Sequence, residues 1–264
     1  MSSPTKTRVK STGGATSTDD FLGGRVSIVQ PRRGHRAGSD TVFLAAAVPA
    51  RRAERVLDVG AGVGVAGLCV LARIPDVEVT AVEIDRELCA LAKQNAARNS
   101  VGDRFKAVNA DVTASTKSLR EAGLEREGYE EIIANPPFHA EDTVRMAPDR
   151  ARAAAHVMKG EGLSVWVRFF ATHAAPKGRL TLILRAEALS EVLRLLDGRF
   201  GDIVVFPLFP KPGEPATRII VQGRKGSRAA LRLLPGLVLH EPDGSYTAKA
   251  EAVLRGGEAL DCGA

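Results

Sequence analysis

Seven short runs rich in valine, isoleucine and leucine recur along the chain from residue 54 onward, and their spacing restricts the fold more than any other feature. The first five are separated by roughly 20 or more residues, which is enough for a helix that crosses between parallel strands. Near-continuous apolar strands of this kind belong to a parallel sheet covered on both faces. In chain order the runs are RVLDVG, VTAVEID, FKAVNADV, EIIANPPF, RLTLILR, DIVVFPLF and RIIVQGR.

The last two runs are joined differently, because only the Pro/Gly-rich segment PKPGEPAT lies between them. This connection is too short for a crossover helix, so we predict an antiparallel hairpin. The whole pattern predicts an α/β protein with a doubly wound, Rossmann-like, seven-stranded and mostly parallel sheet that ends in this hairpin.

The rest of the chain is divided by composition. The first twenty residues are rich in Ser, Thr and Gly and carry basic residues with no acid before Asp19, which predicts a disordered basic arm. The next segment reads as a short strand, a basic loop and a helix that starts near Ser39 or Asp40. We therefore expect a disordered arm, an N-terminal extension, the α/β domain and a tail at residues 1–20, 21–50, 51–256 and 257–264.

Other classes of protein find little support in the composition. No apolar run approaches the roughly 20 residues that span a bilayer, so no membrane partner is expected. The three cysteines show neither the spacing of a metal site nor a disulfide framework, which predicts a cytoplasmic protein without a metal. The oligomeric state stays open.

A glycine-rich turn, VLDVGAGVGVAGL, follows the first strand of the domain and opens a predicted helix. Glycines let the backbone approach a ligand, and helix N-termini offer free N–H groups to it. The dinucleotide spacing G-x-G-x-x-G fails because Val65 occupies its last position. Asp58 would add negative charge at a pyrophosphate site, so it suits a cationic amino-acid ligand better.

Acidic residues end the next two strands. Glu83 lies twenty-one residues beyond Gly62 and can accept hydrogen bonds from both hydroxyls of a ribose. Asp111 can receive an adenine amino group, whereas Asp85 is expected to cap the helix 85–99. Turn and acids together resemble the S-adenosylmethionine site of class I methyltransferases, although each alone is also compatible with helix packing or capping. The cofactor-binding residues are predicted to be Asp58, Gly60, Ala61, Gly62, Gly64, Glu83, Ile84, Asp111, Val112 and Asn135.

The fourth strand runs directly into Asn135, Pro136, Pro137 and Phe138, which are the predicted catalytic residues. An exocyclic amine is a poor nucleophile that gains positive charge as it attacks a sulfonium methyl, so it needs hydrogen-bond acceptors. The Asn135 side-chain oxygen and the Pro136 carbonyl can supply two acceptors, the prolines hold that carbonyl in place, and Phe138 can stack on a planar base. The alternative is a plain strand terminator.

Three segments resemble the bacterial tRNA1(Val) adenine-N6 methyltransferase family over roughly residues 21 to 256. They are GGRVSIVQPRRGHRAGSDTVFLAAAVPARRAERVLDVGAGVG, NPPFHAEDTVRMAPDRARAAAHV and PLFPKPGEPATRIIVQGRKGSR. The resemblance implies methylation of the adenosine immediately 3′ of the anticodon in a valine tRNA, with S-adenosylmethionine and no metal. It also implies that Gln30 and residues 36–40 belong to a segment that closes over the cofactor.

Other targets stay open at this point. Phe-His after the two prolines also occurs in ribosomal RNA guanine-N2 methyltransferases, although those enzymes usually have a larger, duplicated chain. A protein glutamine amide methyltransferase is a further alternative, and the lack of a separate N-terminal helical domain counts against it. An RNA-binding scaffold with a cofactor site would have no need of the Asn-Pro-Pro-Phe motif.

The net charge of +6, from 37 basic and 31 acidic residues, favours an anionic partner such as RNA. Six arginines flank the predicted site and are candidates for phosphate contacts, although each alone is more often a solvated surface charge. They are Arg32, Arg33, Arg36, Arg145, Arg150 and Arg152. A further cluster, Arg218, Arg224, Lys225 and Arg228, accompanies the last strand, whose orientation the sequence leaves open. Trp166 is expected in the core.

Overall fold

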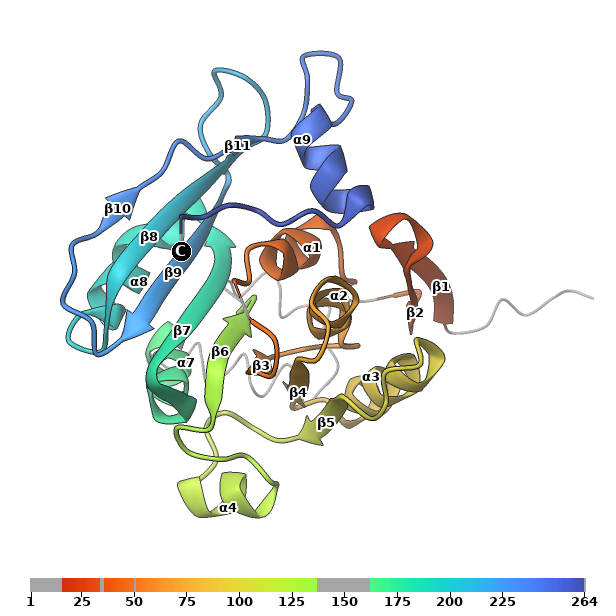
Figure 1. Ribbon diagram of the computed structural model, residues 1–264, viewed down its shortest axis with the longest axis vertical. Coiled ribbons are helices and arrows are strands. Elements are labelled where there is room, and N and C mark those ends of the chain that lie inside the picture. The colour runs from red at the N-terminus through yellow and green to blue at the C-terminus, as the bar shows by residue number, and fades with distance from the viewer. Residues whose placement is uncertain (1–15, 34–35, 50, 137–161, 264) are drawn as a thin grey trace, which may run out of the picture.

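The computed structural model describes residues 16–33, 36–49, 51–136 and 162–263. Its centre is a twisted sheet with the strand order β10-β8-β9-β7-β6-β3-β4-β5, and β11 pairs with β8 (Figure 1). The strands are β3 (Arg55–Val59), β4 (Glu78–Glu83), β5 (Phe105–Asn109), β6 (Tyr129–Ala134), β7 (Ala174–Arg185), β8 (Phe200–Phe209), β9 (Arg218–Lys225), β10 (Arg232–Leu233) and β11 (Leu237–Val238).

The directions of these strands confirm the predicted sheet. β3 pairs in parallel with both β4 and β6, and the parallel pairing continues to β5 on one side and β7 on the other. β9 is antiparallel to β7 and to β8, so the last two long strands form the expected hairpin. The two-residue strands β10 and β11 add in parallel to β8, and no apolar run long enough to predict them exists there.

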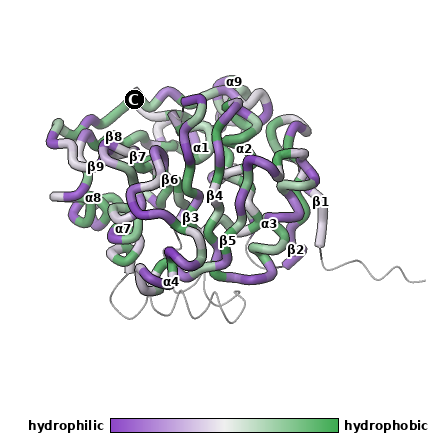
Figure 2. Tube along the Cα trace, turned by 60° about the horizontal axis from the view of Figure 1, so that its bottom comes forward, coloured by the Kyte–Doolittle hydropathy of each residue, from purple (hydrophilic) through white to green (hydrophobic). Residues whose placement is uncertain are grey.

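Helices cover both faces of the sheet and create two apolar cores. One core joins the sheet to α1, α2 and α3, and the other joins it to α4, α7 and α8. Figure 2 shows that the hydrophobic segments gather along the central strands and the inner helices. The helices are α1 (Ser39–Ala46), α2 (Val65–Arg73), α3 (Arg86–Arg98), α4 (Thr116–Glu121), α7 (Gly162–His173), α8 (Leu189–Leu196) and α9 (Ala248–Glu251).

The N-terminal hairpin corrects one expectation. Residues 16–20, which the composition assigned to a disordered arm, belong to β1 (Thr16–Phe21), which pairs in antiparallel fashion with β2 (Val26–Pro31). The strand forms because tertiary contacts hold it: the Asp19 carboxylate accepts hydrogen bonds from Gln30 and Arg36. Composition alone cannot show such long-range partners. Residues 1–15 of the predicted arm lie outside the described part of the chain.

Asn95 of α3 fastens this hairpin to the rest of the molecule. Its fully buried side-chain amide accepts from the Val29 N–H at 2.8 Å and donates to the Val29 carbonyl at 3.0 Å, as a neighbouring strand would. The same amide donates to the Val63 carbonyl at 3.0 Å, within the glycine-rich turn. One turn later, Asn99 makes a similar pair of bonds to Ser27. The hairpin is thus tied to the turn through α3.

Replacing Asn95 with alanine is expected to lower the free energy of unfolding by about 3 kcal/mol, because it leaves a buried carbonyl and two half-buried backbone groups without partners. Asn99→Ala, at the half-buried C-cap position of the same helix, should cost only about 1 kcal/mol. Urea unfolding followed by circular dichroism measures both values. Equal losses for the two variants would contradict the role given to Asn95.

The C-terminal residues 257–263 pack against the domain. Leu260 and Cys262 are buried, and the Leu260 N–H donates to the carbonyl of Ala46 at 2.8 Å. The tail therefore completes the cover over α1. Across the described residues, no helix has the length and apolar character of a membrane span. The same residues contain no cluster of three or more His, Cys, Asp or Glu side chains suited to a metal ion.

Candidate functional site

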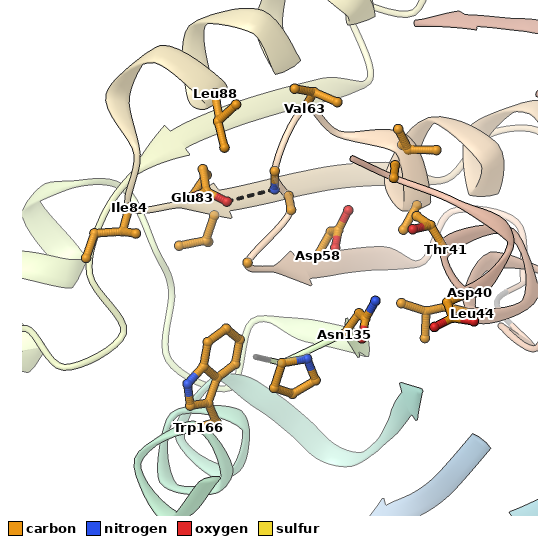
Figure 3. Close-up of a pocket in the computed structure, with 18 of the residues that line it drawn as sticks. Asp40, Thr41, Leu44, Asp58, Val63, Glu83, Ile84, Leu88, Asn135 and Trp166 are labelled. Atoms are coloured by element: carbon orange, nitrogen blue, oxygen red, sulfur yellow. Dashed lines mark hydrogen bonds between the residues drawn. The ribbon is translucent and has the colours of Figure 1, made fainter. Parts of the chain in front are cut away.

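A cavity of about 260 Å³ opens at the carboxyl ends of β3, β4 and β6, where open α/β sheets bind their ligands (Figure 3). The glycine-rich turn forms one wall, the first turn of α1 forms another, and Trp166 of α7 closes the base. Nine of the ten residues predicted to bind a cofactor line this cavity: Asp58, Gly60, Ala61, Gly62, Glu83, Ile84, Asp111, Val112 and Asn135.

Glycine is required at two positions of the turn, Gly60 and Gly64, for different structural reasons. Gly60 has φ 71°, and a Cβ atom there would lie 2.8 Å from the Trp166 ring at the cavity wall. Gly64, the predicted residue that does not line the cavity, has φ 86° and precedes α2. A Cβ atom at Gly64 would lie 2.9 Å from Phe105 and 3.3 Å from Ala92. Gly60 therefore shapes the cavity, and Gly64 lets α2 pack closely on its neighbours.

Glu83 at the end of β4 organises the turn that surrounds it. Its Oε2 accepts from the Gly62 N–H at 2.7 Å (Figure 3), and its Oε1 accepts from the Asp85 N–H at 2.9 Å. The side chain is only 2% exposed. A carboxylate oxygen can accept more than one hydrogen bond, so Glu83 is suited to bind ligand hydroxyls as well. Asp85 caps α3 through the N–H groups of Glu87 and Leu88, which confirms the expectation from the sequence.

Asp58 is a buried carboxyl group on the cavity wall. It is 2% exposed, and its Oδ2 accepts from the Gly67 N–H at 3.0 Å. Burial raises the pKa of Asp58 to about 7, the Gly67 bond opposes this, and the charge of Glu83 adds to it. No basic side chain in the described ranges forms an ion pair with it. A cationic ligand would supply the missing counter-charge.

The far end of the cavity is built from the loops after β4 and β5. Asn109, at the end of β5, donates to the carbonyls of Glu83 and Ile84 at 2.9 and 2.8 Å. These bonds hold the end of β5 against the end of β4. Asp111 accepts from the Thr113 N–H at 2.8 Å, so its carboxylate is held by its own loop. With the apolar side chains of Ile84 and Val112, this end suits a planar heterocycle that carries an amino group.

Asn135 and Pro136 line the cavity where β6 ends, and the Asn135 side chain points toward the side that holds Asp58 and Asp40 (Figure 3). Pro136 is buried, whereas Asn135 is half-buried. Pro137 and Phe138 lie outside the described residues, as do Arg145, Arg150 and Arg152. The start of the predicted catalytic motif therefore shares one cavity with the predicted cofactor residues.

Several lining residues were not predicted. Trp166 is 8% exposed and belongs to the apolar core, as expected, but its ring also closes the cavity. Thr41 and Leu44 enter from α1, next to Asp40, which belongs to the segment 36–40 that the family resemblance places over the cofactor. Leu184, Arg185 and Arg218 enter from β7 and β9. The sequence placed Arg218 in a basic cluster on the last strand, but it did not predict that Arg218 faces the cavity. Arg185 carried no signal, because it is one arginine at the end of an apolar strand.

The other basic candidates lie elsewhere. Arg36 forms an ion pair with Asp19 at 2.7 Å and bonds to Ser17 and the Pro31 carbonyl, so it braces the N-terminal hairpin. Arg32 and Arg33 are exposed directly after β2. Gln30 lines the cavity and accepts from the Ala37 N–H at 3.0 Å, which holds the loop before α1.

Lys225 and Arg224 lie at the opposite end of β9 from Arg218. Lys225 pairs with Glu127 at 2.9 Å, and Arg224 lies 3.9 Å from Asp202. Strand β9 is long enough to separate these two residues from the cavity. The basic cluster therefore divides, and only Arg218 reaches the site.

Comparisons with known proteins agree with this geometry. Residues 35–192 match the model of the family described as methyltransferase small domain. A tRNA1(Val) (adenine(37)-N6)-methyltransferase from Porphyromonas gingivalis is 28% identical over 87% of this chain and 91% of its own length. One from Aeromonas hydrophila is 26% identical over 80% of this chain and 85% of its own.

A solved structure is also similar. The crystal structure of a protein from Agrobacterium tumefaciens, described as a predicted O-methyltransferase, superposes with a TM-score of 0.71. It is 31% identical and covers 84% of this chain and 98% of its own. The similarity extends over nearly the whole of that protein, so the two proteins share the same fold.

Proposed function

The chain belongs to the methyltransferase small domain family, and from this premise we propose that it transfers a methyl group from S-adenosylmethionine to the N6 amino group of an adenosine in tRNA. The P. gingivalis and A. hydrophila relatives carry this activity in their names, which specify position 37 of tRNA1(Val). We extend the proposal to that adenosine, next to the anticodon, and to a cytoplasmic location. The observation that carries it is the meeting of Asn135 and Pro136 with Asp58 and Glu83 around one cavity.

The residues of the cavity fit S-adenosylmethionine. The buried carboxyl of Asp58, with its raised pKa, suits the cationic amino group of the methionine part. Glu83 suits the ribose hydroxyls, and Asp111 with Ile84 and Val112 suits the adenine. When bound, this cofactor supplies an electrophilic methyl group on a sulfonium. The chain would hold it in the cavity at the strand ends, which Asn135 also lines.

The amine that receives the methyl group is activated by hydrogen-bond acceptors rather than by a base. The Asn135 Oδ1 and the Pro136 carbonyl take its two N–H bonds and turn its lone pair toward the methyl group. The bound cofactor would supply the methyl group: as the nitrogen bonds to its carbon and the carbon–sulfur bond breaks, positive charge would grow on the nitrogen. The two oxygens stabilise that charge, and one proton then leaves to solvent.

Two acceptors also favour an amino group over a hydroxyl. A hydroxyl has one hydrogen to donate and must lose it to become a nucleophile, whereas an exocyclic amine uses both acceptors at once. The description of the A. tumefaciens protein as a predicted O-methyltransferase therefore fits this cavity less well. Guanine N2 carries the same kind of amine and is the competing target.

Nucleoside mass spectrometry tests the proposal. Total RNA from cells without the enzyme is incubated with the protein and methyl-labelled S-adenosylmethionine, then digested and separated. Label in N6-methyladenosine from the tRNA fraction is the expected result. Label in N2-methylguanosine would replace adenosine by guanosine as the target, and label in protein alone would move the acceptor to a glutamine amide.

Glu83→Gln is expected to weaken S-adenosylmethionine binding about 10- to 100-fold, because the amide is a weaker acceptor than a carboxylate for ribose hydroxyls and for the Gly62 N–H. Isothermal titration calorimetry gives the dissociation constants. Glu78→Gln, at the exposed start of the same strand, is the matched control and should bind as wild type does. An unchanged affinity for Glu83→Gln would remove Glu83 from the ribose site.

A further inference from the structure

Two arginines stand directly opposite each other at the edge of the cavity. Arg185 ends β7 and Arg218 begins β9, and the antiparallel register pairs them. Two residues further into the sheet, the same register pairs Ile183 with Ile220, and both belong to the core on the face covered by α1. Side chains two residues apart on a strand point to one face, so both guanidinium groups also lie on the α1 side. Both line the cavity.

The two charges differ in how they are compensated. Arg218 donates from Nε to Asp40 at 2.7 Å and from Nη1 to the Thr217 carbonyl at 3.2 Å, so its guanidinium is held in one orientation. Arg185 is exposed and forms no ion pair with any acid in the part of the chain that the structure describes. The two arginines carry two positive charges, and the Asp40 carboxylate compensates one of them. The pair therefore leaves a net positive charge at this edge of the cavity.

Strand geometry gives the position of this edge relative to the catalytic motif. Ala134 of β6 is level with Leu182 of β7, so Arg185 lies two residues beyond the level of Asn135 on the neighbouring strand. That separation is about 7 Å toward the cavity mouth and about 5 Å to the side. A nucleotide whose base amine meets Asn135 has its flanking phosphates on the outer side, at distances that an arginine side chain spans.

We propose that Arg185 and Arg218 form a subsite for a backbone phosphate next to the target nucleotide, with Asp40 orienting Arg218. The proposal rests on the proposed function, since it concerns the acceptor of that reaction. Guanidinium groups form paired hydrogen bonds with phosphate oxygens, and a preoriented Arg218 loses little freedom on binding. The contact would hold the nucleotide so that its base reaches Asn135, without reading the sequence.

A double-mutant cycle tests the subsite without relying on catalysis. The protein is saturated with S-adenosylhomocysteine, and the binding of an anticodon stem-loop RNA is measured by fluorescence anisotropy. A single uncharged methylphosphonate linkage, placed 5′ or 3′ of the target adenosine, should weaken wild-type binding about tenfold at one of the two positions. Arg185→Gln should weaken binding of the unmodified RNA about tenfold, and the methylphosphonate should then add less than a twofold loss.

Controls separate the subsite from a general loss of charge. Arg194→Gln removes an exposed arginine from α8, on the other face of the sheet, and should leave the effect of the methylphosphonate at tenfold. Arg218→Lys keeps a charge but not the paired geometry, and should retain part of the coupling. The proposal would be overturned if, at both linkages, the methylphosphonate weakened RNA binding by Arg185→Gln as much as it weakens RNA binding by the wild-type protein.

The anion could instead be the carboxylate of the cofactor. In that case Arg185→Gln would weaken S-adenosylhomocysteine binding about tenfold and show no coupling with the RNA phosphate, which overturns the proposal. The proposed function is tested separately, by measuring the N6-methyladenosine that the wild-type protein forms. If N6-methyladenosine forms but Arg185→Gln and the methylphosphonate act independently, only the subsite is refuted. If the two changes are coupled but no N6-methyladenosine forms, only adenosine as the acceptor is refuted. If the RNA does not bind, the subsite is refuted as well.

Discussion

Asn135→Ala is expected to lower the rate of methyl transfer about 10²- to 10³-fold. The alanine removes one of two oxygens that accept from the target amine, so the positive charge that grows on the nitrogen is less stabilised. The dissociation constant for S-adenosylmethionine should change no more than about twofold, because the main polar contacts to the cofactor are proposed for Asp58 and Glu83 rather than for Asn135. Single-turnover methylation gives the rate, and calorimetry gives the affinity.

The conservative variant Asn135→Asp distinguishes an acceptor from a structural residue. Aspartate keeps an accepting oxygen at the same position, although it replaces the amide NH2 with a second oxygen and adds a negative charge, so it should recover much of the rate that alanine loses. A purely structural role would instead show as a loss of thermal stability in both variants. An alanine variant with the wild-type rate would exclude Asn135 from the reaction.

The features that the sequence predicted correctly depend on neighbours along the chain. Runs of apolar residues specify strands, the glycine-rich turn follows its strand, and Asp85 caps the helix that begins one residue later. The connection before β9 is too short for a helix, so the hairpin also follows from local spacing. Each of these signals lies within a short window, which is why the number and the relative directions of the main strands could be predicted.

The features that were missed depend on partners far away in the chain. β1 has a polar, serine- and threonine-rich sequence, and it is held by β2 and by the contacts of Asp19 with Gln30 and Arg36. Arg185 and Arg218 meet only because β7 and β9 pair. Trp166 was expected in the core, and only the packing of α7 under the glycine turn brings its ring to the cavity as well. Long-range pairing of this kind leaves no periodic signal.

Asp58 connects the chemistry of the site with the stability of the protein. Burial raises its pKa from 3.8 to about 7, so between these values the folded, ligand-free protein binds a proton that the unfolded chain does not. Stability from this group is therefore fully present below pH 3.8 and is lost as the pH rises through about 7. The ionised carboxylate is useful only when a cation binds beside it.

Asp58→Asn should consequently stabilise the ligand-free protein by about 2–4 kcal/mol at pH 8 and have little effect at pH 4. The asparagine oxygen can still accept from the Gly67 N–H, so the local hydrogen bond is kept. Urea unfolding at the two pH values measures the difference. Asp103→Asn, at an exposed position, is the matched control and should change stability at neither pH.

The same variant should bind S-adenosylmethionine about 10- to 100-fold more weakly at pH 8, because the neutral amide cannot pair with the ammonium group. Wild-type affinity should fall as the pH drops below 7, since cofactor binding must then displace a proton from Asp58, whereas the affinity of Asp58→Asn should stay flat over that range. A variant less stable than wild type at pH 8 and equally sensitive to pH in its affinity would show that another group responds. A variant that gains stability while losing the cofactor would establish that Asp58 is kept buried for binding, at a cost to the ligand-free fold.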